Sequence, residues 1–158
     1  SARHFPIDPA EVERSVAVKA RIVEEDPTER GIRKALNFGH TIGHAFESLS
    51  FARSRPILHG HAVAAGLVCE LYLSHKHCGL PTDDLRRVTH FIRSGYPPFS
   101  FSCRDYDTIY ERMTHDKKNA GRIRFALLRG IGNVAIDQEV PRELVIESFD
   151  FYRENMGQ

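Results

Sequence analysis

The sequence predicts a mainly α-helical, multi-helix domain that carries one small β-hairpin. Its 158 residues fit a single domain, and a hydrophobic content of 41% is ordinary for a globular protein. Apolar residues recur at helical spacing through most of the chain, between breaks made by proline and glycine. Two short β-prone runs separated by Gly130 and Gly132 are the exception, and they predict the hairpin.

Each predicted helix has its own start and stop signals. Asp8 and Pro9 suit the N-cap and the first helical position of the first helix, and Pro27 and Gly31 lie beyond its end. The third helix is apolar almost all round, which predicts a central, buried position, and Gly79 ends it. The predicted helices cover residues 8–25, 32–50, 60–79, 82–94, 105–114 and 141–155, and the two strands lie within 122–130 and 132–137.

Charge and cysteine content narrow the class of protein. A formal net charge of +1 gives no reason to expect nucleic acid or an acidic membrane surface as a partner. No apolar run reaches the length of a membrane span, and the first residues contain no secretory hydrophobic region. Three cysteines without CxxC spacing fit a reducing compartment, so a cytoplasmic protein is expected.

The second predicted helix carries an unusual polar stripe. Its members are Arg33, Asn37, His40 and His44, which fall within about 60° of one another on a helix of 3.6 residues per turn. A cation, an amide and two imidazoles are typical of a binding site, whereas a solvated stripe is usually Lys, Glu and Gln. The alternative is a histidine-rich surface face. Gly39 and Gly43 lie together on another side, where a neighbouring backbone or a ligand approaches closely, or where helices simply pack tightly.

Other candidate site residues lie outside this stripe. Lys19 stands within a stripe of valines on the first helix, where it either snorkels to water or takes part in chemistry. His59 precedes the buried third helix, and two helical histidines four residues apart plus a third from elsewhere commonly form a zinc site. The glutamate of a zinc-protease HExxH motif is missing from HTIGH. Lys117 and Lys118 form either an exposed turn or an anion-binding group.

Three motifs together resemble 3-dehydroquinate synthase. They read GIRKALNFGHTIGHAFES, LHGHAVAAGLVCE and DKKNAGRIRFALLRGIGNVAID, and the resemblance runs from about residue 12 to 149. It concerns only the C-terminal half of that enzyme, and implies the helical domain of the dehydroquinate synthase-like fold. The family's N-terminal half is a Rossmann-like NAD-binding domain, and this chain shows no strand–glycine–helix unit of that kind.

The resemblance implies an activity of the whole enzyme. 3-Deoxy-D-arabino-heptulosonate 7-phosphate, a small sugar-acid phosphate, is converted to 3-dehydroquinate and phosphate in the shikimate pathway. The implied cofactors are catalytic NAD in the full-length enzyme and zinc or another divalent metal. The implied partner is the protein's own N-terminal domain, with a homodimer expected at full length. The chain alone is expected to be inactive.

The resemblance also implies roles for individual residues. His40 and His59 match zinc ligands, and the family's third ligand is a glutamate expected just before this chain begins. His44 matches a histidine that transfers protons around the phosphate, and Lys19 matches an anion-binding residue of the catalytic group. The substrate contacts match Arg33, Asn37 and a lysine of the pair Lys117 and Lys118. One departure stands beside His59, because His61 replaces the glutamate common in the family.

Three alternatives remain at the level of sequence. A metal-dependent polyol or alcohol dehydrogenase shares the implied fold, but would not need Arg33, Asn37 and the DKKN segment. A related sugar-phosphate cyclase uses nearly the same motifs. A non-catalytic helical module with a structural zinc would require a closed four-ligand site, for which His40, His44, His59 and His61 form the only plausible set.

Overall fold

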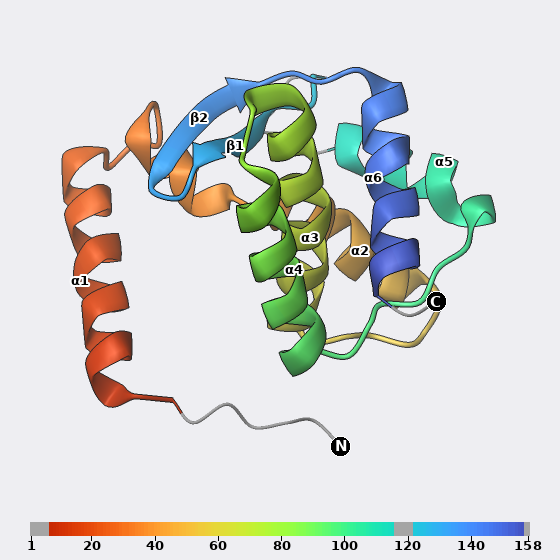
Figure 1. Cartoon of the computed structure of the whole chain (residues 1–158), viewed down its shortest axis with the longest axis horizontal. Coiled ribbons are helices and arrows are strands. Elements are labelled where there is room, and N and C mark those ends of the chain that lie inside the picture. The colour runs from red at the N-terminus through yellow and green to blue at the C-terminus, as the bar shows by residue number, and fades with distance from the viewer. Residues whose placement is uncertain (1–6, 116–121, 157–158) are drawn as a thin grey trace.

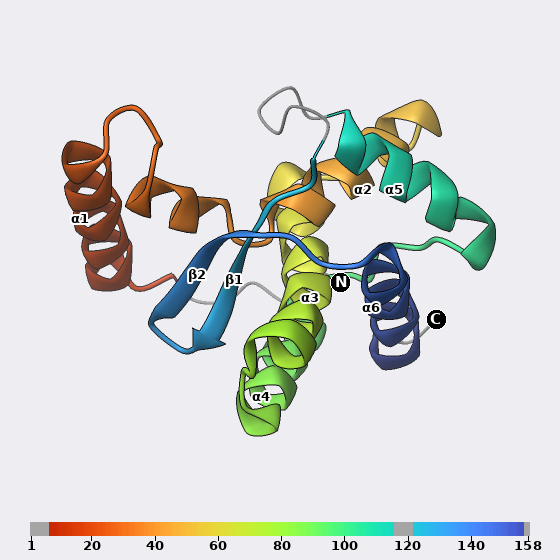
Figure 2. The same ribbon diagram turned by 90° about the horizontal axis from the view of Figure 1, so that it is seen from above.

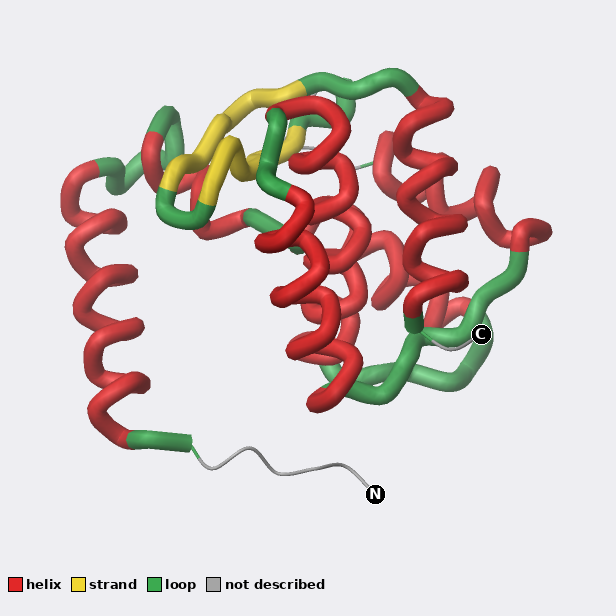
Figure 3. Tube along the Cα trace, in the orientation of Figure 1, coloured by secondary structure: helices red, strands yellow, loops and turns green. Residues whose placement is uncertain are grey.

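The computed structural model describes residues 7–115 and 122–156 and confirms the predicted fold class. Helices dominate, and a two-stranded antiparallel hairpin supplies the strands found among the described residues (Figures 1 and 3). None of the described helices combines the length and the hydrophobicity that a membrane span requires. The elements are α1 (Pro9–Glu25), η1 (Ile32–Asn37), α2 (His40–Ala52), α3 (His59–Cys78), α4 (Thr82–Gly95), η2 (Cys103–Asp105), α5 (Tyr106–Thr114), β1 (Phe125–Gly130), β2 (Asn133–Gln138) and α6 (Arg142–Asn155).

Helix α3 is the centre of the domain, as its apolar sequence predicts. It packs against α2, α4, α6 and β1, so most of its circumference is covered. The core joins Phe46 of α2, Leu71 and Leu73 of α3, and Phe149 and Tyr152 of α6, all of which are fully buried. Gly79 ends α3 in a left-handed conformation with φ of 78°, the role predicted for it.

The prediction of one continuous helix over residues 32–50 is wrong. Residues 32–37 form the 3-10 helix η1, and α2 begins only at His40. Between them, Gly39 adopts a left-handed conformation with φ of 84°, which turns the chain. The polar stripe is therefore divided between two helices, with Arg33 and Asn37 on η1 and His40 and His44 on α2.

Close packing of α2 on α3 accounts for Gly43 of the first motif and Gly66 of the second. A Cβ atom on Gly43 would lie 3.0 Å from Cα of Val63, and one on Gly66 would lie 2.2 Å from the carbonyl oxygen of Gly39. The two backbones therefore approach each other at a level where side chains have no room. The glycine pair is therefore explained by tight packing of the helices α2 and α3, backbone against backbone, and no ligand is needed to account for it.

Helix α1 stands apart from the rest of the domain (Figures 1 and 2). It has no buried residues, and its main tertiary contact is with η1. Val12 and Val16 are exposed, so the valine stripe that contains Lys19 is not packed against the described core. Lys19 is likewise exposed on α1, outside the packed part of the described chain.

Glu70 is a fully buried carboxyl group in the middle of α3. One of its oxygens accepts a hydrogen bond from the backbone N–H of Gly39 and the other from that of Ile42. Burial raises the pKa of Glu70 from 4.5 to about 8, although the two backbone hydrogen bonds act in the opposite direction.

This raised pKa predicts how stability changes with pH. The folded protein binds the Glu70 proton more tightly than the unfolded chain does, so this contribution is complete below the unfolded pKa of 4.5 and is lost as the pH rises to about 8. We expect the free energy of unfolding, measured by urea denaturation, to fall between pH 5 and pH 8 by a few kcal/mol, on the order of what such a shift supplies. Glu70→Gln should flatten this slope, and an unchanged slope would contradict the prediction.

Candidate functional site

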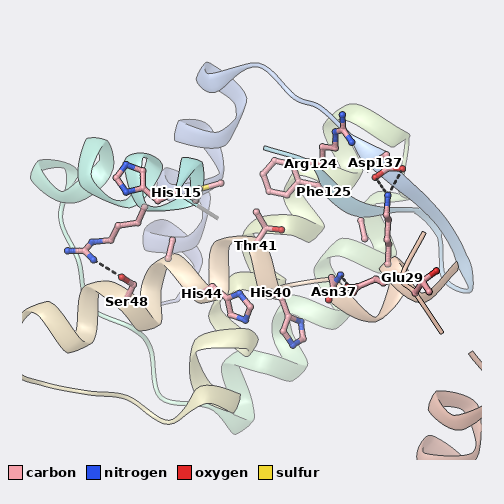
Figure 4. Close-up of a pocket in the computed structure, with 16 residues that line it drawn as sticks. Glu29, Asn37, His40, Thr41, His44, Ser48, His115, Arg124, Phe125 and Asp137 are labelled. Atoms are coloured by element: carbon pink, nitrogen blue, oxygen red, sulfur yellow. Dashed lines mark hydrogen bonds and ion pairs between the residues drawn. The ribbon is translucent and has the colours of Figure 1, made fainter. Parts of the chain in front are cut away.

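A cavity of about 600 Å³ opens between η1, α2, α5 and the hairpin (Figure 4). Its wall brings together polar groups from distant segments, such as Lys34 and Asp137, which are 103 positions apart in the sequence. The side chains that carry its chemistry are Glu29, Lys34, Asn37, His40, Thr41, His44, Ser48, Arg112, His115, Arg124 and Asp137. Such a concave, polar-rimmed space is typical of a small-molecule site.

Three histidines gather where this cavity meets an adjoining hollow: His40 and His44 line the cavity, and His59 lines the hollow. The ring centroids of His40 and His44 are 5.4 Å apart, and the ring of His59 lies 5.6 Å from that of His40 and 5.8 Å from that of His44. One nitrogen from each ring lies within 4.8 Å of the others. The expectation that His59 lies beside His40 is therefore confirmed, although His59 comes from the first residue of a different helix.

Two of these rings are held by hydrogen bonds through Nδ1. In His59, Nδ1 lies 2.7 Å from a carboxylate oxygen of Glu47, and in His40, Nδ1 lies 3.3 Å from the carbonyl oxygen of Phe38. Because the partners are acceptors, Nδ1 acts as the donor, which leaves Nε2 as the ring nitrogen that can bind a metal. Histidine that binds a metal through one ring nitrogen is usually held through the other in this manner. Three imidazoles at this spacing match the nitrogen donors that zinc takes.

The turn before η1 is built around Asp26. Its carboxylate accepts hydrogen bonds from the backbone N–H groups of Arg30, Gly31 and Arg33. These bonds, led by that from Arg30, hold the pKa of Asp26 below its usual value. Glu29 lies within this turn at φ of 56°, an uncommon conformation for a residue with a side chain. Its carboxylate accepts a 2.8 Å hydrogen bond from the amide nitrogen of Asn37, which fixes the orientation of that amide in the cavity wall.

Cationic side chains surround the cavity. Lys34 spans from η1 to β2, where its ammonium group lies 2.8 Å and 3.0 Å from the two carboxylate oxygens of Asp137. Arg112 reaches from α5 to α2 and donates a 2.6 Å hydrogen bond to the hydroxyl of Ser48. With Arg124, three cations line the cavity against the two carboxylates of Glu29 and Asp137. The wall is therefore suited to an anionic molecule before any histidine is protonated.

The structure gathers only some of the predicted site residues. Asn37, His40 and His44 line the cavity, and His59 lines the adjoining hollow with His44 and Glu47. The guanidinium group of Arg33 instead donates to the carbonyl oxygen of Pro27, and Arg33 is not part of the cavity wall.

The remaining predicted residues have different outcomes. Lys19 is exposed on α1, away from the cavity wall. Lys117 and Lys118 lie outside the described residues. His61 packs edge-on against the ring of Tyr96 and does not join the histidine group. Among the described residues, the closed four-histidine set that a structural zinc would require is therefore not assembled.

Sequence reasoning missed several residues of the site. Glu47 follows His44 by three positions and could have been found as a carboxylate on the same face of the helix. Lys34 was not predicted as a site residue. A continuous α-helix would have placed Arg33, and not Lys34, on the same face as Asn37 and His40. Arg112 and Arg124 gave no local signal, since only the folding of α5 and the hairpin over α2 brings them here.

A family model and individual relatives of this chain point to the same protein family. A model of the protein family described as "3-dehydroquinate synthase C-terminal" matches residues 6–119. A 3-dehydroquinate synthase of Parabacteroides distasonis is 66% identical over 147 residues, which are 92% of this chain and 42% of that protein. A 3-dehydroquinate synthase of Pseudomonas aeruginosa is 40% identical over 139 residues, 85% of this chain and 36% of that protein. The chain thus spans about two fifths of the length of these relatives.

Solved structures share the fold at low sequence identity. A 2-epi-5-epi-valiolone synthase from Streptomyces hygroscopicus, with NAD⁺ and Zn²⁺ bound, superposes with a TM-score of 0.76 at 22% identity, covering 90% of this chain and 39% of that one. A 2-deoxy-scyllo-inosose synthase complexed with carbaglucose-6-phosphate, NAD⁺ and Co²⁺ gives a TM-score of 0.72 at 23% identity, with coverage of 90% and 39%. At these identities the likeness concerns the fold.

Proposed function

The chain belongs to the 3-dehydroquinate synthase family, matching its C-terminal region, and from that premise we propose that it forms the metal- and substrate-binding part of such an enzyme. The proposed reaction of the whole protein converts 3-deoxy-D-arabino-heptulosonate 7-phosphate to 3-dehydroquinate and phosphate. Its family membership and its relative at 66% identity favour this reaction over that of the other cyclases. The cation-lined cavity fits an anionic substrate better than the neutral alcohol of a polyol dehydrogenase.

One observation carries the proposal. Three imidazoles meet where a cavity with a cation-rich wall joins the adjoining hollow, and their nitrogens lie within 4.8 Å of one another. A substrate with a carboxylate, a phosphate and several hydroxyl groups requires these two features side by side. The cations bind the anionic ends, and the nitrogen donors hold a metal against the hydroxyl groups.

His40 and His59 are proposed to hold zinc or another divalent metal through Nε2. A bound divalent cation supplies a Lewis acid that eases the loss of a proton from a substrate hydroxyl group. A glutamate from the segment that precedes this region in the family is proposed as the third ligand. Homodimer formation by the full-length protein stays a prediction.

His44 is proposed as the group that carries a proton to and from the substrate near its phosphate. Its ring is exposed at the cavity and lies 5.4 Å from that of His40, so a substrate held at the metal lies within its reach. Asn37, whose amide is oriented by Glu29, is proposed to bind a substrate hydroxyl or carboxylate. The geometry lends no support to the substrate contacts proposed for Arg33 and Lys19, whereas it favours Lys34, Arg112 and Arg124 as anion-binding groups.

NAD is proposed to come from a nucleotide-binding domain outside this chain. Hydride transfer requires the nicotinamide to be positioned against the substrate, and the sequence shows no strand–glycine–helix unit of the kind that binds a dinucleotide. The chain alone should therefore have no NAD-dependent turnover. Phosphate release from the heptulosonate phosphate, with NAD⁺ and Zn²⁺, should be measured for the full-length protein and for this chain. Failure of the full-length protein to release phosphate would refute the proposed reaction, and turnover by the chain alone would refute the domain assignment.

Replacement of Glu47 should weaken the proposed metal site. Glu47 holds the His59 ring in one orientation and one tautomer, so Glu47→Ala leaves that ring free to rotate. We expect Co²⁺ affinity, measured by absorption titration of the full-length protein, to fall roughly 10- to 100-fold, as for other carboxylates that support metal ligands. Glu143→Ala, in the first turn of α6 and outside the site, is the control and should bind Co²⁺ as the wild type does. Equal affinities for the two variants would contradict the role of Glu47.

A further inference from the structure

Glu70 has no part in the chemistry proposed above. It is nevertheless a fully buried acid that is hydrogen-bonded to the segment carrying His40. It lies on α3, and both of its carboxyl oxygens are used by the chain segment that joins η1 to α2. The distances are 3.0 Å to the nitrogen of Gly39 and 3.1 Å to the nitrogen of Ile42. Gly39 precedes His40 and Ile42 follows it in the sequence, so the carboxyl group binds the backbone on both sides of His40.

The first backbone N–H groups of α2 need hydrogen-bond acceptors from outside the helix. The first N–H groups of a helix have no partner within the helix, and a side chain at the N-cap usually supplies one. Here the N-cap is Gly39, which has no side chain, and Gly43, one turn further along the helix, is buried. A larger residue at position 39 is excluded because a Cβ atom would lie 2.7 Å from Cγ of Leu67 and because φ is positive. The cap must therefore come from elsewhere in the chain, and Glu70 provides it.

We propose that Glu70 is a positioning residue, which fixes the first turn of α2 and thereby aims the rings of His40 and His44 at their common centre with His59. The inference rests on the proposed function, since it concerns the same metal site. His40 is the first residue of α2 and His44 lies one turn further, so rotation or fraying of this turn moves both rings relative to His59. A misplacement of about 1 Å is enough to weaken a metal or catalytic site substantially.

Three variants of the chain test this proposal. Glu70→Met keeps the approximate volume but accepts neither hydrogen bond, and Glu70→Gln retains one acceptor oxygen for one of the two N–H groups. Ser74→Ala is the matched control. Ser74 is equally buried on the same helix, one turn further along. Its hydroxyl donates to the backbone carbonyl of Glu70 and accepts from the backbone N–H of Leu128 in the hairpin, and neither bond involves the Glu70 carboxyl group or α2. It should lower stability without changing the histidines.

Two measurements separate positioning from stability. The first is the NMR shifts of the histidine ring nitrogens in the metal-free full-length protein, and the second is Co²⁺ affinity by titration of the same samples under conditions where they are folded. For Glu70→Met we expect altered shifts for His40 and His44 and at least a tenfold loss of Co²⁺ affinity. Glu70→Gln should lie between Glu70→Met and the wild type, and Ser74→Ala should match the wild type in both measurements.

The outcomes also separate this proposal from the proposed function. If the wild-type full-length protein binds no Co²⁺, the proposed metal site fails, and the ring shifts alone decide the role of Glu70. Unchanged shifts and affinity in a folded Glu70→Met variant would overturn the positioning role. If Glu70→Met does not fold, Glu70→Gln decides by the same two measurements, and wild-type values for it would overturn the proposal.

Discussion

Replacement of His44 by alanine in the full-length protein should lower kcat by roughly 10²- to 10⁴-fold, the range that a positioned proton-transfer group supplies. The imidazole lies at the cavity beside His40, and His44 is an exposed residue outside the hydrophobic core. Phosphate release at saturating substrate, NAD⁺ and metal measures the effect. The KM for substrate should change far less than kcat, since the proton transfer occurs on the way to the transition state.

Metal content distinguishes two ways in which this variant could fail. Zinc bound per mole of His44→Ala should match that of the wild type if His44 transfers protons, whereas loss of zinc would identify His44 as a third metal ligand. His77→Ala provides the control, because His77 is exposed in the last turn of α3 and lies outside the cavity. Turnover of His44→Ala at the wild-type rate would remove His44 from the catalytic group.

Replacement of Gly66 by alanine should destabilise the domain by ~3–5 kcal/mol or prevent folding, which is the upper range for single substitutions. The added Cβ would lie 2.2 Å from the carbonyl oxygen of Gly39 and 2.4 Å from the nitrogen of Gly43. Both are backbone atoms at the crossing of α2 and α3, so no side chain can rotate to make room. Urea denaturation followed by circular dichroism measures the change in the free energy of unfolding.

Gly60 offers a matched control on the same helix. A Cβ atom there would meet no atom within 4 Å, and alanine is favoured over glycine in a helix. Gly60→Ala should therefore be neutral or slightly stabilising, whereas Gly66→Ala should not. Equal stability of the two variants would show that α2 and α3 can separate without cost, and would contradict the close packing that underlies the histidine site.

Much of the fold follows from local patterns. The apolar character of residues 60–79 places α3 in the core, and Gly79 and Gly132 lie at the left-handed positions that end a helix and turn a hairpin. These signals act over a few residues, so the features that they specify can be predicted from the local sequence. The break at Gly39 does not have such a signal. Glycine within an apolar helical pattern is compatible with a continuous helix, and the cap that favours the break comes from Glu70, 31 residues further along.

The site, like the fold, has some features that local sequence predicts and others that depend on contacts between distant segments. The sequence by itself determined that His40 and His44 share one face, because they lie one turn apart within α2, and that glycines flank them for close approach. Only the tertiary structure decided that Lys34 rather than Arg33 enters the cavity, that Glu47 holds His59, and that α1 leaves Lys19 in solvent. The physical reason is that these outcomes depend on helix breaks and on contacts between distant elements, whose free energies are set by packing and not by the periodicity of any one segment.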